Sequence, residues 1–176
     1  MGHDDFEDAE DGGGGSWENL IKNKNIVGLS VRQKIGRWFE KSTVFFLKLR
    51  GCDVGKNCKI SKSAIIDRAH SKGVHIGDNT RVLIEVMILA HDYSRSALDG
   101  YDMWCDTYIG KNCVIGGRAM IMPGVKIGDH VYVGGGAVVS HDVPEHCIVA
   151  GNPARIVRKG TIIGNNGKIL EKGERV

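Results

Sequence analysis

The most regular feature of the chain is a large aliphatic residue at every sixth position. A first run of this repeat is interrupted once by an insertion of four residues, and a second run continues without a missed step. The leading residues are Val54, Ile60, Ile66, Ile76, Val82 and Ile88, followed by Ile109, Ile115, Ile121, Ile127, Val133 and Val139. Short strands separated by tight turns stack into a prism, so the repeat predicts a parallel β-helix.

Positions within each six-residue unit favour the same fold. Glycine often follows the leading residue, and we expect the chain to turn there. Small or β-branched residues occupy the fifth position and would share a narrow interior with the leading side chains: Cys58, Ala64, Thr80, Val86, Cys113, Ala119, Val125, Val131 and Ala137. The spacing alone does not give the hand of the coil.

The segment before the repeat has a different period. In residues 17–51, apolar side chains recur at spacings near three and four, which is typical of an amphipathic helix: Val31, Ile35, Trp38, Phe39, Phe45, Phe46 and Leu49. We expect this helix to cap the open end of the β-helix. Its opposite face is basic, and such a face either contacts an anionic membrane surface or is exposed to water.

The two ends of the chain are expected to lie outside the β-helix. Residues 1–16 are acidic and end in four glycines, a composition that favours disorder. The sequence therefore predicts a disordered tail at 1–16, a helical segment at 17–51, a β-helix domain at 52–160 and a C-terminal tail at 161–176.

The repeat lapses for one long stretch, residues 92–108, which we expect to form a loop extruded from the coil. Long excursions from a rigid scaffold commonly carry function. This one contains aromatic rings and hydrogen-bonding groups suited to a polar, ring-shaped ligand, among them Asp92, Tyr93 and Trp104. The alternative is a solvated flap without function.

Charge and cysteine content limit the function classes. The net charge of +3 conceals six acidic residues among the first sixteen, so the remainder is basic, but we expect no nucleic-acid partner. The five cysteines form no Cys-x-x-Cys pair, which gives no sign of a disulfide framework or a zinc site. No apolar stretch of eighteen residues and no signal-peptide pattern is present, so we expect a cytoplasmic protein.

Three segments resemble the hexapeptide-repeat acyltransferases: Ile115 to Asp129, Val133 to Ser140, and the closing Val149-Ala150-Gly151-Asn152-Pro153-Ala154-Arg155. The pattern is most similar to the saccharide O-acetyltransferases of surface-polysaccharide synthesis and to the maltose and galactoside acetyltransferases. This resemblance implies a left-handed parallel β-helix, acetyl-CoA as the acyl donor without a metal, a saccharide acceptor, and a homotrimer with active sites between subunits.

The resemblance also assigns roles to residues. His91 matches the general base, which takes the proton of a sugar hydroxyl as its oxygen attacks the thioester. Glu85 stands near a position where an acceptor-binding Asn is common. It would contact the acceptor, orient an imidazole of a neighbouring subunit, or be an exposed surface residue. Asp92, Tyr93 and Trp104 would contact the acceptor.

Five residues match positions that line the coenzyme A groove in the family: Gly117, Gly135, Ser140, Arg155 and, less closely, Arg158. Glycine would let the pantetheine arm lie against the backbone, and the arginines would meet phosphates.

Three alternatives stay open. The first is an amino-sugar N-acetyltransferase. The second is a metal enzyme like the γ-class carbonic anhydrases, suggested by the spacing of His70 and His75, although His70 falls on the irregular insertion. The third is a non-catalytic β-helix scaffold, which would bind no coenzyme A.

Overall fold

The computed structural model describes residues 42–96, 102–165 and 167–176. All of them belong to one compact unit, Arg37–Val176. The predicted tail at 1–16 and most of the predicted helical segment lie outside the described residues, as does the tip of the predicted loop.

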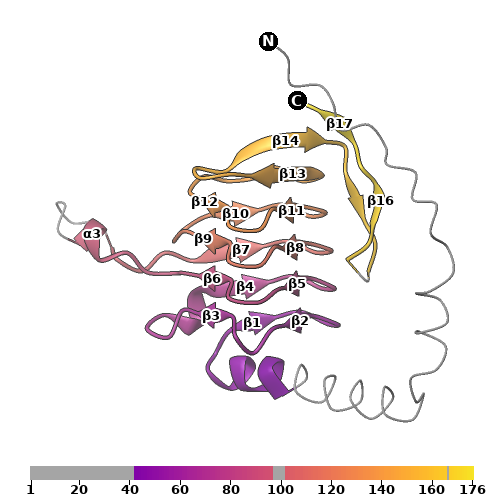
Figure 1. Cartoon of the computed structure of the whole chain (residues 1–176). Coiled ribbons are helices and arrows are strands. Elements are labelled where there is room, and N and C mark those ends of the chain that lie inside the picture. Colours follow the sequence, from indigo (N-terminus) through magenta and orange to yellow (C-terminus); the bar gives the residue numbers. More distant parts are fainter. Residues whose placement is uncertain (1–41, 97–101, 166) are drawn as a thin grey trace, which may run out of the picture. The chain divides into compact units, whose positions relative to one another are not determined.

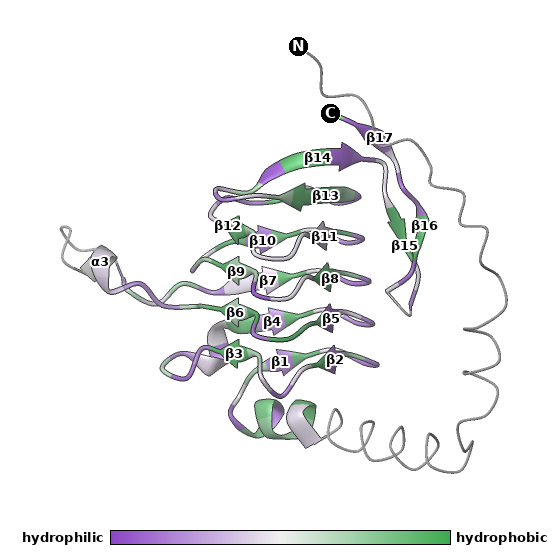
Figure 2. Cartoon of the chain, in the orientation of Figure 1, coloured by the Kyte–Doolittle hydropathy of each residue, from purple (hydrophilic) through white to green (hydrophobic). Residues whose placement is uncertain are grey.

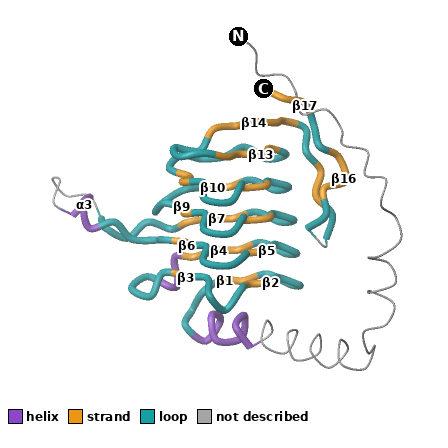
Figure 3. The backbone as a smooth tube through the Cα atoms, in the orientation of Figure 1, coloured by secondary structure: helices purple, strands orange, loops and turns teal. Residues whose placement is uncertain are grey.

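The described chain is mostly β, with short strands that ascend in successive turns of a coil (Figure 1, Figure 3). The coil strands are β1 (Asp53–Val54), β2 (Lys59–Ile60), β3 (Ile65–Ile66), β4 (Val74–Ile76), β5 (Arg81–Val82), β6 (Met87–Ile88), β7 (Thr107–Ile109), β8 (Val114–Ile115), β9 (Met120–Ile121), β10 (Lys126–Ile127), β11 (Tyr132–Val133), β12 (Val138–Val139) and β13 (Cys147–Ala150). A short 3₁₀ turn, η1 (Ser71–Gly73), precedes β4, and α3 (Tyr93–Ser96) lies in the excursion.

The coil strands form three parallel sheets, one on each face of the prism. Sheet A has the order β1-β4-β7-β10, and sheet C has the order β3-β6-β9-β12. The parallel part of sheet B has the order β2-β5-β8-β11-β13. Leading residues pair with leading residues, as Ile66 does with Ile88 and Ile88 with Ile121. The predicted parallel β-helix is therefore confirmed at the level of its sheets.

The core is the stack of leading residues. All twelve are buried and belong to one hydrophobic cluster, together with most of the predicted fifth-position residues. In Figure 2 hydrophobic colour runs along the strands of sheet C, strands β1, β4 and β10 carry hydrophilic colour from their outward residues, and the turns between sheets A and B are hydrophilic. Because side chains alternate across a strand, each leading residue points inward and its neighbour points outward.

The glycines after the leading residues stand where each strand ends and a turn begins, and the stacking of the coils adds a second requirement. A Cβ on Gly77 would lie 2.7 Å from the carbonyl carbon of Gly110, and a Cβ on Gly116 would lie 2.6 Å from the Val133 oxygen. These glycines are needed because stacked coils approach closely there. The left-handed backbone occurs two residues later, at Asn57, Asn79, Asn112 and then His130.

Residues 42–49 are helical, and Leu47 is buried in the coil's hydrophobic cluster with Val44 packed against it. The predicted apolar face was wrong for this part of the helix, because Phe45, Phe46 and Leu49 are exposed. Val44 and Leu47 are three positions apart and so share one side of the helix. Among the described residues, no helix is long and apolar enough to cross a membrane.

Residues 161–176, expected to be a tail, contain strands, and an antiparallel strand just before them falls within the predicted β-helix domain at 52–160. β14 (Arg155–Lys159) pairs antiparallel with β13 and β17 (Glu174–Arg175), and β15 (Ile162–Ile163) pairs antiparallel with β16 (Ile169–Glu171). Two stacked histidine rings hold this segment against the coil, since His130 Nδ1 lies 2.9 Å from the Ile163 oxygen and His146 Nδ1 lies 3.0 Å from the Thr161 oxygen.

Candidate active site

His91 is paired with a buried carboxylate. Its Nδ1 lies 2.5 Å from Asp67 Oδ2, and the Asp67 side chain is fully buried while His91 remains 22% exposed. The stacking of the coils causes this contact, because Ile66 pairs with Ile88 and so brings the residues after β3 beside those after β6. With Nδ1–H donating to Asp67, the lone pair of a neutral His91 is on Nε2, as a general base requires.

The Asp67 carboxylate is held in its charged form by several donors. Its Oδ1 accepts from the backbone N–H groups of Ala69 and His70, and its Oδ2 accepts from the N–H of Ala90 as well as from His91. Burial alone would raise the pKa of Asp67, but the hydrogen bonds from Ala90, His70 and His91 outweigh it and lower that pKa. A charged Asp67 fixes the imidazole orientation and would stabilise the imidazolium.

The long excursion begins and ends beside this pair. His91 and Trp104 form an antiparallel bridge, and hydrogen bonds join Asp92 to Met103 and Cys105 to Ala90 across its root. The Trp104 ring lies 6.1 Å from the His91 ring, and the Tyr93 ring meets His91 edge-on at 5.5 Å. Two of the predicted acceptor residues, Tyr93 and Trp104, therefore stand next to the predicted base.

Asp92 has a local structural contact. Its Oδ1 accepts from the backbone N–H and the hydroxyl of Ser94, at 2.9 Å and 2.6 Å, at the start of α3. This contact shapes the first turn of the excursion.

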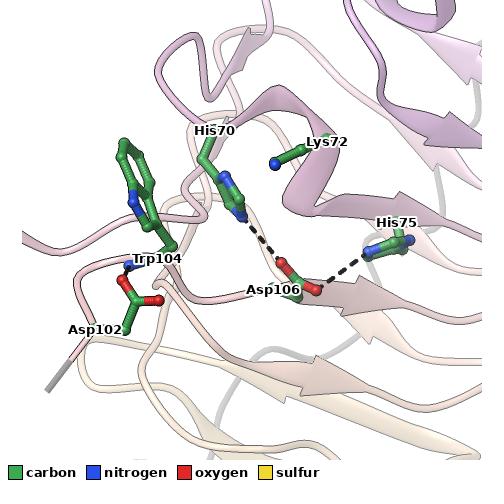
Figure 4. Close-up of a pocket in the computed structure, with 6 residues that line it drawn as sticks. All are labelled: His70, Lys72, His75, Asp102, Trp104 and Asp106. Carbon is green, nitrogen blue, oxygen red and sulfur yellow. Dashed lines mark hydrogen bonds and ion pairs between the residues drawn. The ribbon is translucent and has the colours of Figure 1, made fainter.

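A cavity of about 550 Å³ opens on the other side of Trp104. His70, Lys72, His75, Asp102, Trp104 and Asp106 line it (Figure 4). Asp106 lies between the two histidines, with Oδ1 3.0 Å from His70 Nε2 and Oδ2 3.9 Å from His75 Nε2. The close spacing of these histidines in sequence thus places both rings at one carboxylate. Within the described ranges, no group of three His, Cys, Asp or Glu residues has an arrangement that would hold a metal ion.

Glu85 lies at a different corner of the coil from His91. It occupies the turn between β5 and β6 with a left-handed backbone, and its Oε2 accepts from Arg118 Nε at 2.7 Å. Both side chains are largely exposed. Within one chain Glu85 therefore pairs with Arg118, and the carboxylate that orients His91 is Asp67 instead.

The residues predicted to contact coenzyme A are divided between two corners of the chain. Gly117 and Gly135 stack at the corner between sheets B and C, where the Gly136 N–H donates to the Gly117 carbonyl. Ser140 follows β12 at the corner between sheets C and A and bonds His141. Arg155 is exposed at the start of β14.

Open backbone at Gly135 and Gly136 is compatible with a thin ligand lying against this corner. A Cβ on Gly135 would meet only the Gly117 oxygen within 4 Å, and one on Gly136 would meet nothing. Arg158 is less suited to bind a phosphate, because its Nη1 already donates to the Gly173 carbonyl at 3.0 Å.

Three site residues were not predicted as such from the sequence: Asp67, Lys72 and Asp106. Asp67 directly follows the leading residue Ile66, where the repeat first breaks, and that break was the available signal. Asp106 lies at the end of the excursion, and only the fold shows that it faces His70 and His75.

Comparison with known proteins agrees with this architecture. Residues 106–141 match the family model described as bacterial transferase hexapeptide (six repeats). The chain carries the hexapeptide repeat of these transferases. The resemblance inferred from the sequence is thereby confirmed over the second run of the repeat.

Individual relatives and solved structures extend the likeness. A chloramphenicol acetyltransferase of Agrobacterium fabrum (strain C58 / ATCC 33970) is 33% identical over 127 residues, which cover 70% of this chain and 60% of that protein. The crystal structure of the polySia specific acetyltransferase NeuO has a TM-score of 0.54 and 27% identity, covering 63% of this chain and 52% of that one. A maltose O-acetyltransferase from Clostridium difficile 630 has a TM-score of 0.50 and 25% identity, covering 81% and 88%.

The chain spans about three fifths of the length of the first two curated relatives that it matches, 61% and 60%.

Proposed function

We propose that the protein is an acetyl-CoA-dependent O-acetyltransferase that acts on a hydroxyl of a saccharide, with His91 as the general base. The observation that carries the proposal is the His91–Asp67 pair at the root of the excursion, which leaves Nε2 as the basic nitrogen. Similar proteins named as acetyltransferases for polysialic acid and maltose support the reaction class and the acceptor class.

Acetyl-CoA would supply an acetyl group as a thioester. His91 Nε2 takes the proton of the acceptor hydroxyl while the hydroxyl oxygen bonds to the acetyl carbonyl carbon. The carbon–sulfur bond then breaks, and the proton passes from His91 to the departing thiolate. Asp67 takes no proton in this sequence and acts by holding the imidazole in position.

The donor is proposed to lie along the corner of Gly117 and Gly135, with Arg155 near its phosphates. In one chain this corner and His91 lie at different edges of the prism. A trimer, as the resemblance implies, would bring the corner of one copy to the His91 of the next, and this explains why the predicted site residues divide between corners.

The experiment is to measure thiol release from acetyl-CoA with a panel of saccharides, amino sugars and chloramphenicol. Release that depends on a hydroxyl acceptor is expected, with product analysis locating the acetyl group on oxygen. Acetylation of amino sugars on nitrogen would instead identify an N-acetyltransferase. Absence of thiol release and of coenzyme A binding in the full chain would overturn the proposal.

The carbonic anhydrase alternative has its own test. The purified protein would contain stoichiometric zinc or iron and form bicarbonate if that alternative held. His70 bonds Asp106, and His75 lies beside the carboxylates of Asp53 and Asp106. Substitution of the two histidines is expected to leave the metal content of the protein unchanged.

A further inference from the structure

We propose that the cavity lined by His70, Lys72 and Asp106 binds a second sugar unit of the acceptor, so that the acceptor is an oligosaccharide or polymer. This inference rests on the proposed function, because it assumes that the reacting hydroxyl is at His91.

The cavity is adjacent to the base but separate from it. The Trp104 ring lies 6.1 Å from His91 on one side and 5.0 Å from His70 on the other, and Trp104 is 42% exposed. Figure 4 shows Trp104 at one end of the group and His75 at the other, with Asp106 between the two histidines. A unit reacting at His91 and a unit in the cavity would thus flank the same indole.

The lining suits a hydroxylated ligand. Lys72 only donates hydrogen bonds, the Asp102 and Asp106 carboxylates only accept them, and sugar hydroxyls do both. The charges are of both signs, so the cavity has no strong preference for an anionic or a cationic ligand. An exposed aromatic ring beside polar side chains provides the apolar surface that a sugar ring packs against.

The volume of the cavity is large enough for a bound sugar unit. About 550 Å³ falls within the roughly 300–1,000 Å³ of typical small-molecule sites. The walls are firmly positioned, because His70 bonds Asp106 and the His75 ring stacks on Tyr108 with centroids 4.4 Å apart.

The test compares acceptors of increasing length, using glucose to maltotetraose and sialic acid with its linked dimer and trimer. For wild type, kcat/KM is expected to rise about 10-fold from the shortest to the longest member of the accepted series. Lys72→Ala and Asp106→Asn are expected to abolish most of this gain through KM, while the shortest acceptor keeps its kcat/KM. Lys111→Ala, in the turn between β7 and β8, is the matched lysine control and should keep the full gain.

Binding is measured separately on the His91→Ala protein by calorimetry with the longest acceptor. Weaker binding when Lys72→Ala is added supports the cavity independently of turnover. Equal kcat/KM for short and long acceptors, or equal losses on both in the Lys72→Ala protein, would overturn the inference. An enzyme without activity on any saccharide would instead refute the proposed function.

Discussion

At the residue scale, the site depends on one buried carboxylate. Asp67 accepts hydrogen bonds from three backbone N–H groups and from His91, and none of its side chain is exposed. A charge in this position is stable only because its hydrogen bonds offset the cost of burial. His91 could be predicted from the sequence because it stands where the repeat breaks and matches a family motif. Asp67 could not, because its partner lies 24 residues away and only coil stacking joins them.

Replacing this carboxylate tests its positioning role. Asp67→Asn is expected to lower kcat roughly 10²–10⁴-fold, since the imidazole loses its orientation and the stabilisation of its charged form. KM for both substrates should change little. The control is Asp53→Asn, which alters an exposed carboxylate 3.3 Å from His75. Equal kcat in the Asp67→Asn protein and wild type would contradict the role.

The same carboxylate makes stability depend on pH. Because the pKa of Asp67 is lowered in the folded protein, its stabilisation is present above the unfolded-state pKa of about 3.9 and is lost as pH falls through the folded-state pKa. Chemical denaturation at neutral pH should show wild type more stable than Asp67→Asn by about 1–3 kcal/mol. Its advantage should shrink as the pH falls below 4. A difference that is constant with pH would count against a charged Asp67.

At the element scale, the coil could be predicted because each of its strands up to β12 ends on a leading residue of the six-residue repeat. Every leading residue from Val54 to Val139 is buried, and each pairs with its equivalent in an adjacent coil. Elements outside this repeat were predicted less well. Phe45, Phe46 and Leu49 are exposed on the helix at residues 42–49, and the C-terminal strands follow no six-residue period.

The repeat predicts that the two neighbouring isoleucines of β3 contribute unequally to the free energy of unfolding. Ile66→Ala should lower the free energy of unfolding by about 2–5 kcal/mol, because Ile66 is buried and its loss leaves a cavity. Ile65→Ala should cost less than about 1 kcal/mol, because Ile65 is 50% exposed. Denaturant unfolding measures both changes. Similar losses of stability in the two variants would contradict the assignment of Ile66 as the buried leading residue.

The histidine stack predicts a local effect at the C-terminus. His130→Ala removes the hydrogen bond to the Ile163 oxygen, so amide exchange should accelerate in β15 and β16 but not in the coil strands β7 to β9. Lys172→Ala, at an exposed position of the same segment, is the control. Unchanged exchange in β15 and β16 of the His130→Ala protein would show that other contacts hold them.

At the scale of the whole molecule, the proposed site needs more than one copy of the chain. His91 and the glycine corner of Gly117 lie at different edges of the prism, because one follows sheet C and the other precedes it. The sequence predicts both parts from the family motifs, but the division between corners is visible only once the three sheets are assigned.

A mixing experiment tests whether the site is shared. His91→Ala and Gly117→Trp should each be inactive alone, and trimers reassembled from equal amounts should regain about a quarter of wild-type activity, since a quarter of shared sites are intact. Sedimentation verifies that mixed trimers form. Mixed trimers without activity would show that each chain carries its own complete site.

The role of His91 is tested most directly by measuring thiol release from acetyl-CoA by wild type and His91→Ala with the best saccharide acceptor. Loss of the general base is expected to lower kcat roughly 10²–10⁴-fold in the His91→Ala protein. The affinity of the His91→Ala protein for coenzyme A is expected to stay unchanged. Undiminished turnover by a correctly folded His91→Ala protein would show that His91 is not the general base.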